Sequence, residues 1–333
     1  MIETPILVAF GIFLALAFDF GNGLNDAANA ISTIVATRVL SLRAAVVLSA
    51  FFNFVAAFTF STAVAETMGR GVVDPAAINA YVVIAGLVSA VIWVYGLSWL
   101  GMPISASHAL IGGLVGAAVA AAGWDVVKLE GLVKIVVFIF LAPILGMVFG
   151  YLFSLLVLIA VKRMPPEKVQ KHFKKLQLLS VSVYSLGHGA NDAQKTMGII
   201  TLLLFIGGFI TDFHVPAWVV LASHSTIAIG TLAGGWAVVK TMGTQITKLR
   251  PIDGFCAETA GAGVIIGSSA FGIPVSTTHV ITGSISGVGV MNRTTAVNWS
   301  IAKRIVYAWF LTIPLTALVA AVVYLVLGAV LGF

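Results

Sequence analysis

Apolar residues fill most of the chain and form ten long segments separated by short polar connections. The segments lie at residues 5–37, 44–65, 78–100, 104–122, 131–161, 177–210, 216–239, 252–271, 274–291 and 300–332. Runs of about 20 apolar residues are typical of transmembrane helices. The pattern predicts an all-α polytopic membrane protein with about 10–12 transmembrane segments, the higher number counting broken helices or re-entrant hairpins separately.

Composition supports this fold class and excludes a soluble protein. Of 333 residues, 60% are hydrophobic and 9% are charged, whereas about 25% are charged in soluble domains. The first segment follows no basic region, which favours a retained span over a cleaved signal peptide. Cys256 is the single cysteine, so an internal disulfide or a multi-thiolate metal site is excluded, and the residue is expected to pack in the core.

The distribution of basic residues predicts the orientation. The net charge of +6 would suggest nucleic-acid binding in a soluble protein, but here most lysines and arginines fall in alternate connections, at residues 38–43, 162–175, 240–250 and 293–304. By the positive-inside rule these connections are cytoplasmic. We therefore expect a multi-pass protein of the cell membrane, surrounded by lipid, with both termini extracytoplasmic and no nucleic-acid partner.

A basic stretch divides the chain into two similar halves. Residues 1–161 form a predicted N-terminal transmembrane repeat, residues 162–176 a basic cytoplasmic linker with Pro165 and Pro166, and residues 177–333 a C-terminal transmembrane repeat. Each half has five segments. Because an odd number of crossings makes the second copy enter from the opposite face, the two repeats are predicted to have inverted topology.

One polar motif occurs in both halves. The second half contains Gly187-His188-Gly189-Ala190-Asn191-Asp192-Ala193-Gln194-Lys195-Thr196-Met197-Gly198, and the first half contains the weaker copy Phe20-Gly21-Asn22-Gly23-Leu24-Asn25-Asp26-Ala27-Ala28-Asn29-Ala30. Both copies lie near the middle of segments too long for one straight crossing. The four glycines therefore predict helix breaks at Gly21, Gly23, Gly187 and Gly189, and Pro143 and Pro314 predict bends in the fifth and tenth segments.

A second pair of motifs strengthens the repeat. Pro103-Ile104-Ser105-Ala106-Ser107-His108 begins the fourth segment of the first half, and Pro274-Val275-Ser276-Thr277-Thr278-His279 begins the fourth segment of the second. The two copies are separated by nearly the same number of residues as the first pair. Inverted repeats with paired broken helices are typical of secondary transporters, whose binding site lies near the middle of the bilayer.

The acidic residues of the motifs are candidate cation ligands. A carboxylate at the bilayer centre costs at least ~2.5 kcal/mol unless it is compensated, and Na⁺ bound by Asp26 and Asp192 would compensate it. The alternative is that these side chains cap half-helices or pair with Lys195. Asn25, Asn29 and Asn191 would complete the cation site, with helix capping as the alternative. Glu258, a further buried acid, is a candidate coupling residue, and Asp19 is another.

The hydroxyl residues of the second motif are candidate anion ligands. Backbone N–H groups and hydroxyls at helix starts bind anions without a full counter-charge, although ordinary N-capping is the alternative. The predicted phosphate-binding residues are Ser105, Ser107, His108, Ser276, Thr277, Thr278 and His279, together with the donors Gln194 and Lys195. For the histidines, hydrogen bonding within the core is the alternative. His188 is a proton-relay candidate, and His224 is expected in the core.

These motifs resemble the inorganic phosphate transporter (PiT) family. The sequence Gly187 to Gly198, its copy at Gly21 to Asp26, and the Pro-x-Ser-[Thr/Ala]-[Thr/Ser]-His pair are all similar to it. The resemblance implies cation-coupled phosphate symport, an inverted-repeat fold and a homodimer. The chain departs from the family at Asn53, where members often have glutamate, and keeps Glu258 as the apparent second-half counterpart of that position.

We therefore expect a secondary active transporter that imports inorganic phosphate by symport with Na⁺ or H⁺, with alternating access around a midplane site. Importing net negative charge into a negative cell interior costs ~2.3 kcal/mol per charge per 100 mV, so cations must enter with the anion. A sulfate or other tetrahedral-oxyanion symporter is the alternative. A channel would not need duplicated buried carboxylates, and we expect no enzyme and no resident cofactor, although Ser/His pairs are present at both Pro motifs.

Overall fold

The structure is a computed structural model that describes residues 4–234, 236–244 and 246–332. These residues form twelve α-helices and three short 3₁₀ helices. The α-helices are α1 (Thr4–Ala36), α2 (Leu42–Val55), α3 (Ala63–Arg70), α4 (Ala80–Trp99), α5 (Ala106–Ala122), α6 (Leu129–Val161), α7 (Pro166–Ile206), α8 (Ala217–Ala233), α9 (Trp236–Thr244), α10 (Pro251–Ala270), α11 (Thr277–Asn292) and α12 (Trp299–Leu331). The 3₁₀ helices are η1 (Ala56–Phe58), η2 (Trp124–Val126) and η3 (Thr294–Ala296).

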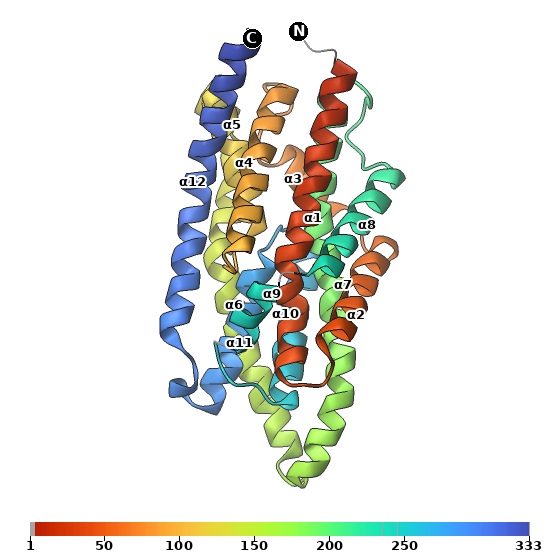
Figure 1. Cartoon of the computed structure of the whole chain (residues 1–333), viewed down its shortest axis with the longest axis vertical. Helices are drawn as coiled ribbons and strands as arrows, with labels where there is room; N and C mark the ends of the chain where they lie inside the picture. Colours follow the sequence, from red (N-terminus) through yellow and green to blue (C-terminus); the bar gives the residue numbers. More distant parts are fainter. Residues whose placement is uncertain (1–3, 235, 245, 333) are drawn as a thin grey trace.

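Helices α1–α6 and α7–α12 form two copies of one arrangement. Helix α1 packs on α8 as α7 packs on α2, α1 packs on α4 as α7 packs on α10, and α5 packs on α12 as α11 packs on α6. Figure 1 shows that α1 and α7 run in opposite directions. The predicted all-α fold with two inverted repeats is therefore confirmed, and the exchange of α5 and α11 between the halves interlocks them.

The helix breaks do not lie at the predicted glycines. Both α1 and α7 are continuous through Gly21, Gly23, Gly187 and Gly189, so this prediction is wrong. The glycines instead permit close helix contacts. A Cβ on Gly23 would lie 2.3 Å from the Ile227 carbonyl oxygen, and small residues are what allow two helices to approach this closely.

The second segment of each half is broken instead. Helices α2 and α3 meet at 84°, and α8 and α9 meet at 77°. The next two helices of each half, α4 with α5 and α10 with α11, pack together as a hairpin, and Figure 1 shows α4 ending beside the middle of α1. Broken helices are thus present, but they flank the motif helices rather than interrupt them.

Four described helices are long and apolar enough to cross a membrane: α1, α4, α6 and α12. The two bent pairs raise the number to six. In α6 and α12 only 17% of the most apolar window is buried inside the protein, so these two helices present apolar side chains outward. Both continue through a proline, Pro143 in α6 and Pro314 in α12.

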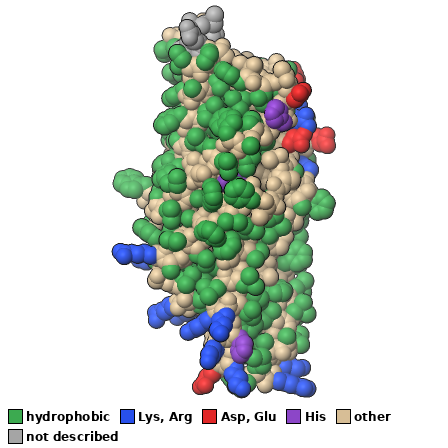
Figure 2. All heavy atoms as spheres, turned by 90° about the vertical axis from the view of Figure 1, so that its right-hand side faces the viewer, with side chains coloured by type: hydrophobic (Ala, Val, Ile, Leu, Met, Phe, Trp, Pro, Cys, Tyr) green, Lys and Arg blue, Asp and Glu red, His purple; other side chains and the backbone are tan. Residues whose placement is uncertain are grey.

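Charge separates the two ends of the bundle. The turn between α6 and α7 lies at the lower end, whereas α1 begins and α12 ends at the upper end (Figure 1). In Figure 2 most of the lysines and arginines on the visible face gather toward the lower end, below a broad apolar surface. Helix α7 already begins at Pro166, so residues 166–176 of the predicted linker extend this helix; proline is well suited to a first helical turn.

Candidate functional site

The two motif aspartates meet inside the bundle. Asp26 on α1 is 3% exposed and Asp192 on α7 is 1% exposed. A carboxylate oxygen of each and a ring nitrogen of His188 all lie within 4.8 Å of one another. The Nε2 atom of His188 is 3.2 Å from Asp192 Oδ2. Two carboxylates this close in a buried site repel each other, so the cluster requires positive charge.

The start of α11 lies against both aspartates. Thr277 Oγ1 is 3.1 Å from Asp192 Oδ2 and 3.3 Å from Asp26 Oδ2. Thr278 Oγ1 is 3.3 Å from Asp26 Oδ1 and 2.9 Å from the Ile104 carbonyl oxygen. A hydroxyl has a single proton, so each threonine donates to one of its two acceptors at a time. The contact with Ile104 brings the start of α11 next to the segment that precedes α5.

Lys195 is fully enclosed beside Asp192. Its Nζ forms an ion pair with Asp192 Oδ1 and donates to the Val275 carbonyl oxygen at 2.8 Å. The side chain is 1% exposed. The alternative that Lys195 pairs with Asp192 is therefore present. The ammonium group already has two oxygen partners and is not a free donor for an incoming anion.

The asparagine that directly precedes each motif aspartate presents an oxygen without a partner among the described residues. Asn25 Nδ2 donates to Ser98 Oγ at 2.7 Å, and Asn191 Nδ2 donates to Ser269 Oγ at 2.8 Å. These bonds orient the amides, and within the described residues both buried Oδ1 atoms lack a hydrogen-bond donor. Buried acceptors are nearly always satisfied in proteins. An unpaired oxygen in each half therefore fits a cation ligand.

Asn29, unlike Asn25 and Asn191, directs its amide toward the threonines of α11. Its Nδ2 donates to Thr278 Oγ1 at 2.9 Å and lies 3.4 Å from Thr277 Oγ1. A hydroxyl oxygen that accepts this bond keeps its proton for donation to a carboxylate. Asn29 thus helps to orient the two hydroxyls toward the aspartates.

Two further acids lie on either side of this cluster. Glu258 on α10 accepts hydrogen bonds from Thr33 (2.6 Å), Gln177 (2.9 Å) and Ser180 (2.5 Å). Thr33 lies seven residues beyond Asp26 on α1, about 10 Å along the helix. The three donors stabilise a carboxylate that is separate from the aspartate pair.

Asp19 lies seven residues before Asp26 on α1, on the other side of the cluster from Thr33 and Glu258. Its Oδ1 accepts from Thr196 at 2.9 Å, and its buried Oδ2 has no partner within the described residues. The acids along α1 therefore lie about two helical turns apart, a spacing of about 10 Å.

The hydroxyls of Ser105 and Ser276 act as N-caps. Ser105 Oγ accepts from the His108 backbone N–H at 3.3 Å, and Ser276 Oγ accepts from the His279 N–H at 3.4 Å. The capping alternative is therefore present at both sites. Capping uses a lone pair of the hydroxyl and leaves its proton available to an acceptor. Ser107, in the first turn of α5, is 5% exposed.

The motif histidines hold the helices together. His279 Nδ1 lies 3.2 Å from the Ile139 carbonyl oxygen. This carbonyl lacks its intrahelical donor because Pro143, four residues later, has no N–H. The His279 ring also stacks on Trp309, with ring centres 3.6 Å apart, and lies 4.5 Å from the His108 ring. The alternative of hydrogen bonding within the core therefore holds for Nδ1 of His279, because this atom faces a backbone carbonyl oxygen.

Gln194 supports a neighbouring helix. Its Oε1 accepts from the backbone N–H groups of Val64 at 2.8 Å and Ala65 at 3.3 Å. These are among the first residues of α3, whose early N–H groups have no partners within the helix. The side chain predicted to bind phosphate through a donor therefore uses its oxygen to cap α3.

Sequence reasoning missed the residues that orient the site. Ser98 and Ser269, which hold the asparagine amides, recur at the same spacing as the Pro motifs and were detectable from that repeat. Gln177 and Ser180, the partners of Glu258, lay in a segment with no repeated signal. The comparison of Asn53 with Glu258 was wrong, because Asn53 lies on α2 whereas Glu258 lies on α10, and these helices hold different positions in their repeats.

Asn53 instead connects to the aspartate cluster. Its Oδ1 is 3.1 Å from His188 Nδ1, and its Nδ2 donates to Thr231 Oγ1 at 3.0 Å. His188 therefore joins α2 to Asp192. His224 lies elsewhere on α8, where its Nδ1 is 3.0 Å from the Val220 carbonyl oxygen, as expected for a core residue.

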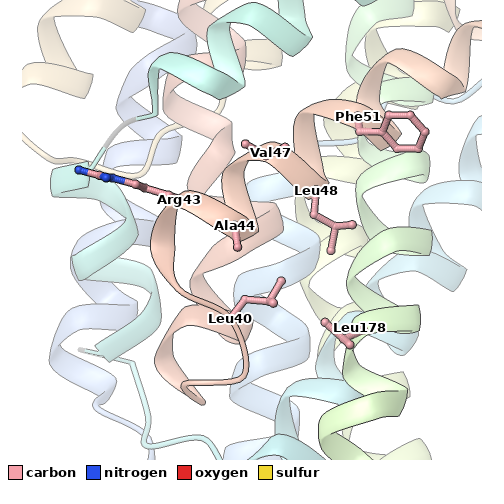
Figure 3. Close-up of a pocket in the computed structure, with 7 residues that line it drawn as sticks. All are labelled: Leu40, Arg43, Ala44, Val47, Leu48, Phe51 and Leu178. Carbon is pink, nitrogen blue, oxygen red and sulfur yellow. The ribbon is translucent and has the colours of Figure 1, made fainter.

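An apolar groove on the outer face is unrelated to this cluster. It has a volume of about 620 Å³ and lies between the start of α2 and α7 (Figure 3). Its lining consists of Leu40, Arg43, Ala44, Val47, Leu48, Phe51 and Leu178. With one charged side chain among its lining residues, the groove has no set of polar ligands for a small ion.

Comparisons with known proteins agree with the repeat. The family model described as "Phosphate transporter family" matches residues 22–165 and again residues 159–320. The "Probable low-affinity inorganic phosphate transporter" of Rhizobium meliloti (strain 1021) is 50% identical over 322 residues, which cover 96% of each chain. The protein of the same description from Bacillus subtilis (strain 168) is 41% identical over 328 residues, or 98% of each chain.

A solved structure has the same fold. The chain described as "The sodium-dependent phosphate transporter" superposes with a TM-score of 0.88 and covers 97% of this chain and 99% of its own. The two sequences are 24% identical. The likeness establishes a multi-pass helical membrane fold with paired inverted halves.

Proposed function

This chain belongs to the phosphate transporter family, and we propose that it imports inorganic phosphate across the cell membrane by symport with Na⁺ or H⁺. One observation carries the proposal: aspartates from the two inverted halves meet in a buried cluster that also receives the start of α11. The names of the relatives support phosphate as the substrate. The basic end of the bundle faces the cytoplasm.

Asp26 and Asp192 bind the driving cation in this proposal. Carboxylate and amide oxygens are hard ligands suited to Na⁺, and a carboxylate or the His188 ring is equally able to take up H⁺. The unpaired Oδ1 atoms of Asn25 and Asn191 supply further oxygens. Glu258, with its own three donors, serves as a separate coupling acid.

The starts of α5 and α11 bind the phosphate. Ser107, Thr277 and Thr278 lie in the first turns of these helices, where backbone N–H groups and the helix dipole favour an anion. Ser105 and Ser276 contribute the protons of their capping hydroxyls. The two helix starts are adjacent, since Thr278 reaches the Ile104 carbonyl, so one tetrahedral anion can contact both.

The threonine hydroxyls couple the two ligands. The hydroxyls of Thr277 and Thr278 lie within hydrogen-bond distance of the aspartate oxygens and can donate their protons to them. A bound cation occupies the carboxylate lone pairs, which releases these protons for phosphate oxygens. Cation binding therefore prepares the anion site, and by linkage phosphate strengthens cation binding to the same extent.

Transport requires the site to open alternately to the two sides. Asp26, Asp192 and both threonines are at most 3% exposed, so the structure has the site closed to solvent. The interlocked halves can rock around the cluster while α1 and α7 stay continuous, as in other inverted-repeat transporters. The homodimer implied by the family resemblance stays a prediction.

The test is uptake of labelled phosphate by purified protein in liposomes under an imposed Na⁺ or H⁺ gradient. We expect gradient-driven uptake that sulfate does not inhibit. Asp26→Asn should abolish it, whereas Asp125→Asn, the same change at an exposed position in η2, should not. Strong inhibition by sulfate together with sulfate uptake would favour the oxyanion alternative, and normal uptake by Asp26→Asn would refute the assignment.

Asp26 is a better target than Asp192 for this test. Removing the charge of Asp192 would leave the buried ammonium of Lys195 without its carboxylate partner. Breaking a buried ion pair in this way costs about 3–5 kcal/mol. Lost uptake in Asp192→Asn would therefore combine lost coupling with lost stability.

A further inference from the structure

We propose that Lys195 is a resident cation that takes the place of one transported cation, so that the Asp26–Asp192 cluster binds one monovalent cation in each cycle. The inference rests on the proposed symport and adds the number of cations that this cluster carries. It follows from an asymmetry between the two halves of an otherwise repeated site.

The internal repeat pairs Lys195 with Asn29. The first half reads Asn25-Asp26-Ala27-Ala28-Asn29, and the second reads Asn191-Asp192-Ala193-Gln194-Lys195. The final residue of each stretch lies three positions after the aspartate, on the same face of its helix. The chain thus has a neutral amide at this place in one half and an ammonium in the other.

The contacts of the two side chains differ in kind. Asn29 donates to the Thr278 hydroxyl at 2.9 Å. The Nζ of Lys195 instead lies against Asp192 Oδ1 and 2.8 Å from the Val275 carbonyl oxygen. A carboxylate oxygen and a backbone carbonyl oxygen are also ligands that a hard metal cation would use. The ammonium therefore occupies a place chemically suited to a small cation.

Charge balance then limits the remaining cations. Two carboxylates and one ammonium leave a net charge of −1 among Asp26, Asp192 and Lys195. The His188 ring is oriented by Asn53: since Asn53 Nδ2 donates to Thr231, its Oδ1 accepts from His188 Nδ1. The ring thereby places Nε2 3.2 Å from Asp192 Oδ2.

The geometry of the remaining ligands suits one cation. A ring nitrogen of His188 and one carboxylate oxygen each of Asp26 and Asp192 lie within 4.8 Å of one another. One monovalent cation between them brings the cluster to neutrality. A second cation, bound before phosphate arrives, would leave a buried excess of positive charge, which is costly in a low-dielectric site.

The test measures coupling stoichiometry in proteoliposomes. Phosphate flux is followed at zero membrane potential while the phosphate gradient that balances a fixed cation gradient is found. For a tenfold cation gradient, each additional coupled cation raises the balancing phosphate ratio about tenfold. Lys195→Asn, which restores the first-half residue, should raise this ratio by that factor, whereas Lys195→Arg, which keeps the charge, should leave it unchanged.

A second variant makes the test independent of Lys195→Asn folding. Asn29→Lys places an ammonium three residues after Asp26, where it should substitute for the transported cation. The phosphate ratio that balances a tenfold cation gradient should then fall about tenfold. The exchange variant Asn29→Lys/Lys195→Asn should regain the wild-type ratio. A wild-type ratio in Asn29→Lys, or in active Lys195→Asn, overturns the inference while leaving symport intact. Absence of any cation-driven uptake by the wild type overturns the proposed function and this inference together.

Discussion

Replacing Gly189 by alanine tests whether the motif glycines permit close packing of helices. A Cβ at Gly189 of α7 would lie 2.7 Å from both the Cα and the carbonyl oxygen of Asn53 on α2. Ordinary contacts begin at 3.4 Å, so α2 must move by about 0.7 Å. The atoms in the way are backbone, and no side-chain rotation relieves the clash.

The expected loss of stability is about 0–2 kcal/mol relative to the wild type, and about 1–3 kcal/mol relative to a glycine-to-alanine change at an uncrowded helix position. Overpacking costs about 1–3 kcal/mol, and the higher helix propensity of alanine returns about 1 kcal/mol or less. Movement of α2 also shifts Asn53 Oδ1 from its position 3.1 Å from His188 Nδ1. We therefore expect weaker cation-driven phosphate uptake in addition to a lower unfolding temperature.

Gly263→Ala is the matched control. Gly263 lies within helix α10, and a Cβ there would meet nothing within 4 Å. This variant should be as stable as the wild type or up to about 1 kcal/mol more stable. Thermal unfolding of the purified proteins in detergent measures both. Equal unfolding temperatures for Gly189→Ala and Gly263→Ala would refute the packing role of Gly189.

Three other substitutions test separate parts of the site and its support. Asn191→Ala removes an unpaired oxygen and should weaken the free energy of cation binding by about 1.5–3 kcal/mol, measured as a higher cation concentration for half-maximal uptake; an unchanged half-maximal concentration would exclude Asn191 as a ligand. Glu258→Gln turns an acceptor that faces three donors into a partial donor, and should lower the free energy of unfolding by about 1–3 kcal/mol, seen as a lower unfolding temperature. Asp253→Ala removes the carboxylate whose Oδ2 accepts from the Arg250 backbone N–H at the start of α10 and whose Oδ1 accepts from Asn292 Nδ2, and should cost about 0.5–2 kcal/mol of stability without affecting uptake by the folded protein; lost uptake would contradict a purely structural role.

The sequence was sufficient to predict the helical repeat but not the position of its breaks. Inverted topology followed from two motif pairs in register and an odd number of segments per half. Glycine has two properties, conformational freedom and small size, that sequence does not separate. At Gly23 and Gly189 the structure shows that small size is the property in use, because the backbone of a neighbouring helix lies against both positions.

The candidate site was predicted in its acids but not in its supporting contacts. Asp26 and Asp192 were identifiable because a buried carboxylate is costly and these are duplicated. The position of His279 depends on a carbonyl freed by Pro143, and that of Gln194 on the start of α3. Both partners are far away in sequence, and only packing of the folded chain brings them together.

Equilibrium binding of phosphate as a function of cation concentration tests the central claim most directly. The measurement is isothermal titration calorimetry on the purified wild type and Asp26→Asn, at several Na⁺ concentrations and pH values. We predict that phosphate affinity rises with the coupling cation in the wild type and is independent of it in Asp26→Asn. An unchanged cation dependence in Asp26→Asn would contradict the account.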